Sequence, residues 1–354
     1  MSKEAGVVKA FIEKIHVKED TTEALNEQAI FAALDDGESD NLAIKVLIIL
    51  GGILATLFFL VFLFLTGIYE HRIGMLVLGL IMVGVSTLVN RQYNKVIVGT
   101  ISVSSYLIGF VFIGISLIEL DKSEDFVSLT VFLLAVLSLL VTPGYLLSFV
   151  AVLMVNGSLL TLLMNEYREH YILVLIPLQA WLLALWYYNE AGILTARNLL
   201  SRIYYPVRTG MVFALVMTLI FIGKRGLLPF SHAYYWLTSI SIFGTIFYVL
   251  HNLFETLDVR SLKRKWSIYA VVICVLLPTI YAPAISSSFL LILLAFHVNH
   301  KTGAAVGIVG LIYFISQYYY DLEFTLLTKS VVLFTSGVLF LLFFYFLNKK
   351  IDWK

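Results

Sequence analysis

Residues 317–330 read Gln-Tyr-Tyr-Tyr-Asp-Leu-Glu-Phe-Thr-Leu-Leu-Thr-Lys-Ser, a polar stretch between two apolar runs, residues 302–316 and 331–347. Lipid accepts both runs, and about 20 apolar residues in a helix cross the hydrocarbon core of a bilayer. Tyrosine suits a membrane–water interface, where its ring stays apolar and its hydroxyl is hydrated. The pattern therefore predicts a membrane crossing on each side of a polar turn.

The composition extends this interpretation to the whole chain. Of the 354 residues, 60% are hydrophobic and 13% are charged, and the mean hydropathy is +0.94. Soluble domains carry about a quarter charged residues, so lipid is expected to be the main solvent. The net charge of +1 argues against a nucleic-acid partner, which requires a basic surface. The single cysteine, Cys274, provides neither a disulfide framework nor a CxxC metal site, and we expect no cofactor.

We predict an all-α fold, a polytopic bundle of about twelve membrane-spanning helices, with counts of ten or eleven left open. The predicted runs are residues 44–68, 73–89, 96–118, 126–141, 145–164, 171–188, 209–222, 233–250, 266–281, 284–297, 302–318 and 328–347. Pro143 and Pro283 divide longer apolar stretches, because proline beside glycine or alanine favours a turn. Pro177 lies inside a run, where it predicts a kink.

The positions of the basic residues orient the bundle. With the N-terminus in the cytoplasm and twelve crossings, eighteen Lys and Arg residues fall on the cytoplasmic side and six on the other. The positive-inside rule predicts this asymmetry, so both termini are expected in the cytoplasm. Residues 1–40 are predicted to form a soluble pair of helices with an acidic linker, and residues 41–354 the membrane domain. Residues 189–208 are amphipathic and are predicted to lie as a helix on the cytoplasmic surface.

Small residues predict close contacts between helices. Gly303 and Gly307 form a GxxxG pair, and Gly74, Gly79 and Gly84 recur within another predicted span. We favour packing inside the monomer over a dimer interface.

The polar turn is the first candidate site. Its candidate residues are Tyr318, Tyr320, Asp321, Glu323, Thr325 and Lys329. Asp321, Thr325 and Lys329 stand four apart, on one face of a helix that begins near Asp321, and the aspartate can cap that helix. Two interpretations remain open. We favour a helix cap with a local polar network, and the alternative adds a partner surface formed by Glu323 and the tyrosines.

Two histidine pairs are weaker candidates for ion or proton binding. His251 and Glu255 stand at i and i+4 near the end of a predicted span, a pattern that also marks a helix leaving the membrane. His297 and His300 could bind zinc with a third ligand, but no cysteine or carboxylate is near in sequence. We favour the simpler interpretation of both pairs. Residues 286–288 are three serines without a nucleophile elbow, so a serine nucleophile is not expected.

Three stretches carry a resemblance to a known family. They are Leu-Asp-Asp-Gly at residues 34–37, just before the first span; Tyr-Ala-Pro-Ala-Ile-Ser-Ser-Ser-Phe-Leu-Leu-Ile-Leu-Leu-Ala-Phe at residues 281–296; and Tyr-Tyr-Tyr-Asp-Leu-Glu-Phe-Thr-Leu-Leu-Thr-Lys-Ser at residues 318–330. With these features the chain resembles a family of bacterial membrane proteins, domain-of-unknown-function family 4401. The resemblance carries over a motif of unassigned role, made of Tyr320, Asp321, Leu322, Thr325, Leu326, Lys329 and Ser330.

The resemblance implies a multi-pass protein of the bacterial inner membrane. Genes of this family often lie beside those of a second multispanning membrane protein and of a small protein with a GDYxxLxY motif, which implies an envelope complex. Our first hypothesis is a non-enzymatic component of such a complex. The alternative is a secondary transporter for a small solute, favoured by a proline-broken helix and opposed by the lack of charged residues in mid-span. A dry bundle would favour the first, and a polar cavity at mid-depth the second.

Overall fold

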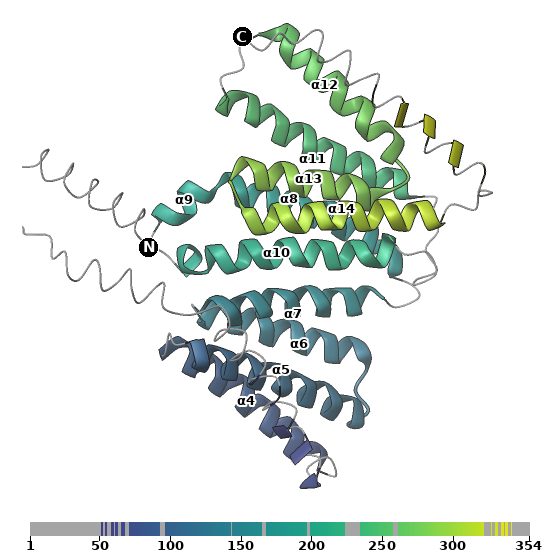
Figure 1. Cartoon of the computed structure of the whole chain (residues 1–354). Helices are drawn as coiled ribbons and strands as arrows, with labels where there is room; N and C mark the ends of the chain where they lie inside the picture. The colour runs from purple at the N-terminus through teal and green to yellow at the C-terminus, as the bar shows by residue number, and fades with distance from the viewer. Residues whose placement is uncertain are drawn as a thin grey trace, which may run out of the picture. The chain divides into compact units, whose positions relative to one another are not determined.

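The computed structural model describes residues 71–92, 96–142, 144–164, 168–196, 199–223, 234–257 and 261–321, with single residues or short runs between 51 and 67 and between 327 and 341. These residues form helices and no strand (Figure 1). The α-helices are α4 (Arg72–Gln92), α5 (Val96–Glu119), α6 (Glu124–Val141), α7 (Tyr145–Leu163), α8 (Ile172–Tyr188), α9 (Glu190–Thr195), α10 (Leu199–Gly223), α11 (Tyr235–Thr256), α12 (Leu262–Leu276), α13 (Pro283–His297) and α14 (Lys301–Asp321). Two 3₁₀ turns, η2 (Glu169–Tyr171) and η4 (Leu277–Thr279), precede α8 and α13.

Most of the described helices follow the predicted apolar runs, but α10 begins at Leu199, ahead of the run 209–222, and α12 ends at Leu276, inside the run 266–281. Breaks occur before Tyr145 and at Pro283, so both predicted proline boundaries are confirmed. Seven of the described helices are long and apolar enough to cross a membrane, and α8 and α13 are apolar but shorter. The predicted runs 44–68 and 328–347 lie largely outside the described residues. The count of twelve crossings and the orientation of the termini therefore stay predictions.

The contacts between Cα atoms divide the chain into two units, Met1–Leu54 and Ala55–Lys354. The predicted soluble leader, residues 1–40, lies outside the described residues. The remaining description concerns the second unit.

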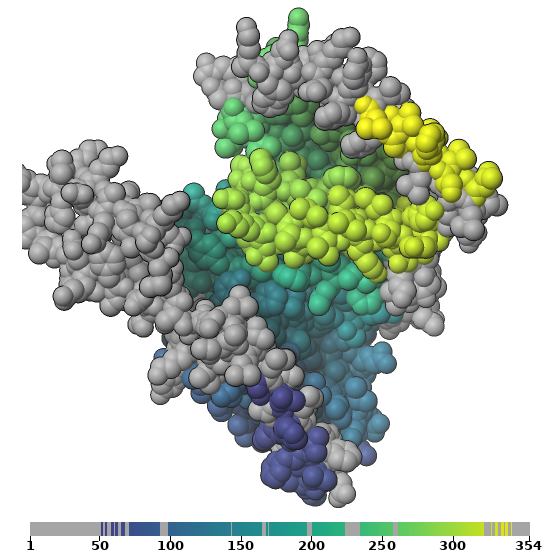
Figure 2. Space-filling view, viewed as in Figure 1, coloured from purple at the N-terminus to yellow at the C-terminus, as the bar shows by residue number. Residues whose placement is uncertain are grey.

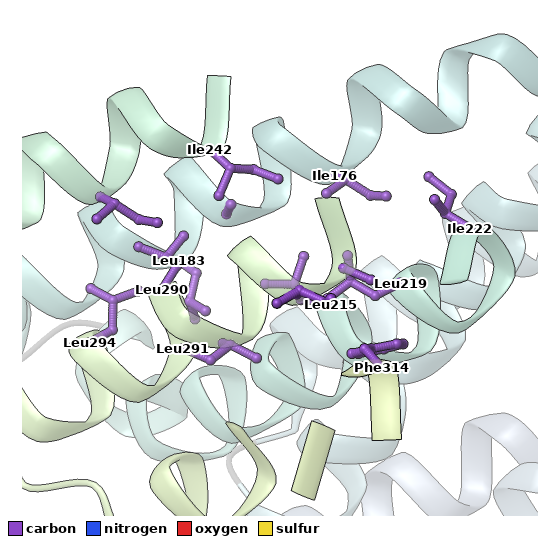
Figure 3. Close-up of a cluster of buried hydrophobic side chains, with 14 of the residues drawn as sticks. Ile176, Leu183, Leu215, Leu219, Ile222, Ile242, Leu290, Leu291, Leu294 and Phe314 are labelled. Atoms are coloured by element: carbon purple, nitrogen blue, oxygen red, sulfur yellow. The ribbon is translucent and has the colours of Figure 1, made fainter. Parts of the chain in front are cut away.

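Two large clusters of buried apolar side chains lie within the second unit. Helices α4 to α7 surround the first, which contains Val83, Tyr106, Phe110, Ile113, Leu117, Ala135, Leu147 and Ala151. Helices α8, α10, α11, α13 and α14 surround the second (Figure 3), which includes Ile176, Leu183, Leu215, Leu219, Ile242 and Leu290. Helix α7 packs against α10 and joins the two groups of helices, while part of α14 remains at the surface (Figure 2).

Glycines permit the closest contacts between helices. A Cβ atom added at Gly79 would lie 2.8 Å from the carbonyl oxygen of Gly109, and one added at Gly109 would lie 2.8 Å from that of Gly79. Added Cβ atoms at Gly303 and Gly307 would both lie within 3.4 Å of side-chain atoms of α13. These glycines pack inside the monomer, as predicted. Gly84 differs, because nothing lies within 4 Å of its added Cβ.

The prediction of a separate surface helix over residues 189–208 was wrong. The first part of this region forms the short α9, and the second part begins α10, which continues through Pro206. Ile203 and Val207 are buried and pack in one cluster with Val152 of α7. Burial against a neighbouring helix therefore decides the course of these residues, although their amphipathic pattern also suits a helix at the lipid surface.

Pro177 lies inside α8, and a neighbouring helix satisfies the backbone group that it releases. Proline has no N–H, so the carbonyl of Leu173, one turn earlier, lacks its usual helical donor. The hydroxyl of Thr238 in α11 donates to this carbonyl at 3.0 Å. The bond links α8 to α11 and pairs a polar group that lipid would leave unpaired.

We expect Thr238→Val to lower the free energy of unfolding by about 1–2 kcal/mol, because the Leu173 carbonyl then loses its donor. Adding Pro177→Ala to that variant should recover most of the loss, since alanine restores the backbone N–H. Thr245→Val is the matched control: the Thr245 hydroxyl bonds the Ser241 carbonyl of its own helix at 3.2 Å, and no other helix depends on it. Unfolding in mixed micelles, followed by circular dichroism, measures each change. Equal losses at the two threonines would contradict this role of Thr238.

Candidate functional site

Helix α13 is a short helix in the second core. Its 15 residues span about 22 Å, less than the about 30 Å of a hydrocarbon core. Helix α14 has 21 residues and follows α13 after a tight turn, so it is longer by six residues (21 minus 15). The last turns of α14 therefore extend beyond the first residue of α13. A pocket, the pocket above α13, lies where α14 extends beyond it.

The pocket has a volume of about 250 Å³ and takes residues from four helices. It is lined by Ile222 and Gly223 of α10, Tyr235 of α11, residues 281–285 at the start of α13, and Phe314, Tyr318 and Asp321 of α14. The pocket therefore brings residues 281–285 together with Tyr318 and Asp321, which belong to two of the three stretches that carry the family resemblance.

One face of α14 forms a wall of the pocket. Phe314, Tyr318 and Asp321 stand at i, i+4 and i+7, which places them on the same side of a helix. The amide nitrogen Nε2 of Gln317 donates to both carboxylate oxygens of Asp321, at 3.0 and 3.1 Å. Phe314 is 2% exposed, and Gly223 lets its ring approach α10, since an added Cβ there would lie 2.9 Å from the ring. The pocket thus joins aromatic rings to one oriented carboxylate.

The start of α13 forms the opposite wall. Pro283 is its first residue, a position where a missing N–H costs no helical bond. Behind it, the hydroxyl of Ser286 donates to the Pro283 carbonyl and that of Ser288 to the Ala284 carbonyl, each at 3.0 Å. These hydroxyls satisfy carbonyls of their own helix.

Three of the candidate residues of the polar turn, Tyr318, Tyr320 and Asp321, lie among the described residues. Tyr318 and Asp321 line the pocket, whereas Tyr320 is 75% exposed and its ring lies 5.7 Å from that of Tyr319. Asp321 is the last residue of α14, so the predicted helix that would begin near it falls outside the described residues. Glu323, Thr325 and Lys329 also lie outside the described residues. The cap and the local network stay predictions.

His251 and Glu255 lie at the end of α11. Their side chains are 61% and 71% exposed, and Nε2 of His251 lies 3.8 Å from Oε1 of Glu255. Among the described residues, no group of three His, Cys, Asp or Glu side chains could hold a metal ion. The pair stands where a helix ends, with no third ligand beside it in that part of the chain.

His297 and His300 contact different tyrosines of α8. The ring of His297 lies 4.9 Å from that of Tyr188, while Nδ1 of the buried His300 lies 2.9 Å from the hydroxyl of Tyr187. Gly303 leaves room for this second contact, because an added Cβ would lie 2.6 Å from Nδ1 of His300. The two histidines thus have separate partners.

Arg208 of α10 is a buried charge that we did not single out from the sequence. Its side chain is 11% exposed, and Nη1 lies 3.3 Å from Oε1 of Glu190. The guanidinium carbon lies 5.2–5.8 Å from the rings of Tyr187, Tyr204 and Tyr205, within cation–π range. Burial, and then the charge of Arg208, lower the pKa of His300 from 6.5 to about 4. The imidazole is therefore neutral at pH 7.

A polar cluster between α7, α8 and α10 also escaped the sequence analysis. Oδ1 of Asn156 accepts bonds from Nε2 of Gln179 at 2.6 Å and from the Thr218 hydroxyl at 3.3 Å. Nδ2 of Asn156 donates to the Ala214 carbonyl at 3.1 Å. Oε1 of Gln179 is buried and has no hydrogen-bond partner among the described residues. A single uncharged polar residue changes the mean hydropathy of an apolar run only slightly. These residues can therefore be recognised as a cluster only when the fold brings them together.

These observations define a class of protein. Seven of the described helices are long and apolar enough to cross a bilayer, and a helix satisfies its own backbone hydrogen bonds there, so the chain is a membrane-embedded helical protein. It belongs to the family described as Domain of unknown function (DUF4401), whose model matches residues 41–350. The resemblance seen in the sequence is thereby confirmed. No curated protein and no solved structure matches the chain.

Proposed function

We propose that the protein is a non-enzymatic component of an assembly in the bacterial inner membrane, and that the pocket above α13 receives a side chain of a partner protein. The observation that carries this proposal is the meeting of residues 281–285 with Tyr318 and Asp321 in one pocket. These belong to the stretches shared with the family, although they are about 40 residues apart in the chain. The surrounding helices hold them together.

The size and chemistry of the pocket suit a protein partner. Sites for small molecules usually enclose about 300–1,000 Å³, and this pocket holds about 250 Å³. Protein interfaces use such hollows for single aromatic or aliphatic anchors. Tyr235, Tyr281 and Tyr318 supply rings and hydroxyls around it. We propose the small GDYxxLxY-type protein as the partner, since its motif offers tyrosine and leucine side chains, with a second multispanning protein completing the assembly.

We expect the double variant Tyr281→Ala/Tyr318→Ala to recover at least about 30-fold less partner than the wild type when both are purified from native membranes, since each of the two lost aromatic anchors weakens binding by more than 1 kcal/mol. Tyr313→Ala is the matched control, because Tyr313 lies on the same helix and does not line the pocket. Quantitative mass spectrometry of the purified material measures recovery. Undiminished recovery with the double variant, at an unchanged melting temperature, would refute the proposal.

One observation favours the transporter as a second candidate. The cluster of Asn156, Gln179 and Thr218 places polar atoms between spanning helices, and Gln179 retains an acceptor without a partner in the described part of the chain. Against it, aliphatic side chains fill the described core between α8, α10, α11 and α13 (Figure 3). We therefore favour the assembly component. The charge asymmetry of eighteen to six supports a cytoplasmic location for both of its termini.

A further inference from the structure

A second hollow, of about 460 Å³, lies between α8 and α11. His170, Tyr171 and Tyr234 form its rim, just before the first residues of the two helices. Below the rim, the trough is lined mainly by apolar groups, among them Val174, Pro177 and Leu237. It shares no lining residue with the pocket above α13, so it is a separate feature.

The groove is short enough to lie within one leaflet of a bilayer. From the rim, its lining extends seven residues along each helix, to Pro177 in α8 and to Ser241 in α11. Seven residues of helix rise about 10 Å, whereas half of the hydrocarbon core is about 15 Å. A spanning helix of a partner would contact α8 and α11 over most of the about 30 Å of that core. The short groove therefore suits a lipid better than a helix.

The walls of the trough use their hydroxyl groups internally. The Thr238 hydroxyl donates to the Leu173 carbonyl, and the Ser241 hydroxyl donates to the Leu237 carbonyl, each at 3.0 Å. Val174 is 60% exposed and Leu237 is 51% exposed, so both present aliphatic surface outward. The trough consequently offers an apolar lining to an acyl chain, because the hydroxyl groups of Thr238 and Ser241 already donate to backbone carbonyls.

The rim has the opposite character. Tyr171 and Tyr234 are 59% and 52% exposed, and the rings of His170 and Tyr234 lie 6.2 Å apart. Phenol groups donate hydrogen bonds to phosphate and ester oxygens, and aromatic residues concentrate at the depth of lipid headgroups. Polar donors at the helix ends and an apolar trough beneath them match an amphiphile in its bilayer orientation.

We propose that this groove binds one glycerophospholipid molecule, with its phosphodiester at the rim and one acyl chain in the trough. The lipid occupies the leaflet at the end of the bundle where α8 and α11 begin. The bound molecule makes defined contacts with this face, in place of the exchanging lipids of the surrounding bilayer. Lipid binding in this groove does not depend on the partner proposed for the pocket above α13. Each of the two proposals can therefore fail in its own experiment without affecting the other.

Filling the trough tests the proposal. Val174→Trp and Leu237→Trp place large rings in the groove, and Leu182→Trp and Ile240→Trp are matched controls at exposed apolar positions of the same helices outside its lining. The purified full chain is washed free of loose lipid, offered phosphatidylglycerol or phosphatidylethanolamine, and analysed by native mass spectrometry. We expect one retained phospholipid in the wild type and controls, and about tenfold lower occupancy in the groove variants, a loss of 1.4 kcal/mol in binding free energy.

Equal lipid occupancy in all four variants would overturn the proposal, as would loss of a co-purified protein in place of lipid. If the tryptophan variants do not fold, Tyr171→Phe/Tyr234→Phe keeps the packing and removes only the rim hydroxyls. We expect that variant to melt as the wild type does and to rebind the phospholipid about tenfold more weakly, since two hydrogen bonds are lost. Rebinding with unchanged affinity would overturn the placement of the phosphodiester and with it the proposal.

Discussion

Placing a methyl group at Gly79 or Gly109 is expected to lower the free energy of unfolding by about 1–3 kcal/mol, and placing one at both to lower it further. At either position the added Cβ would lie 2.8 Å from the backbone carbonyl oxygen of the other glycine. A backbone atom cannot rotate away as a side chain can, so α4 and α5 must move apart and lose contacts along their length. Helix association in lipid depends on such close packing.

Gly84→Ala and Gly114→Ala are the matched controls for this contact. They lie on the same two helices, and nothing is within 4 Å of an added Cβ at either position. Alanine also favours a helix over glycine by up to about 1 kcal/mol. The control substitutions should therefore leave stability unchanged or raise it, so that the sign differs between the two sets. A loss at Gly84 equal to that at Gly79 would show that α4 and α5 do not meet as described.

Acidification from pH 6.5 to pH 4 is expected to lower the free energy of unfolding through His300. Burial, with Arg208 nearby, lowers the pKa of His300 from 6.5 to about 4 in the folded protein. At pH 7.5 and above the imidazole is almost entirely neutral in both states, so it adds almost no dependence on pH. Between pH 6.5 and pH 4 the unfolded chain binds a proton and the folded chain does not, so stability falls as the pH falls. Below about pH 4 both states bind the proton and this contribution levels off.

His300→Asn should remove this part of the pH dependence. The variant is also expected to be less stable at pH 7.5, because the contact between His300 and the Tyr187 hydroxyl, now 2.9 Å, is altered. His251→Gln is the control, since His251 is 61% exposed at the end of α11 and its loss should leave the slope in place. Melting temperatures across pH 4–8 in one detergent measure both. If His300→Asn keeps the wild-type slope, another group causes it.

The helical segments could be predicted from the sequence because hydropathy acts directly on a chain in lipid. Only a helix satisfies its own backbone there, so apolar length and proline position indicate where helices begin and end. The break before Tyr145 and the start of α13 at Pro283 follow this rule. The start of α10 does not, because residues 199–208 owe their place to packing of Ile203 and Val207 beside α7. Amphipathic character alone does not separate that arrangement from a helix lying on the membrane.

The candidate site could be predicted only in part. Tyr318 and Asp321 drew attention as polar residues beside an apolar run, and both line the pocket. The sequence did not indicate that Gly223 and residues 281–285 would join them, since this depends on the different lengths of α13 and α14. Arg208 was counted among the cytoplasmic charges, but its tyrosine neighbours come from two helices and meet only in the folded chain.

The shortness of α13 has a consequence for how the protein enters the membrane during synthesis. A segment of 15 residues is below the about 17–25 residues of a stable span, so α13 alone has a weak hold on the bilayer. Helix α14 has 21 residues and follows after a turn of three residues, 298–300, with Gly303 and Gly307 placed against α13. We therefore expect the two segments to enter the bilayer as one helical hairpin, in which packing against the longer second helix stabilises the shorter first one.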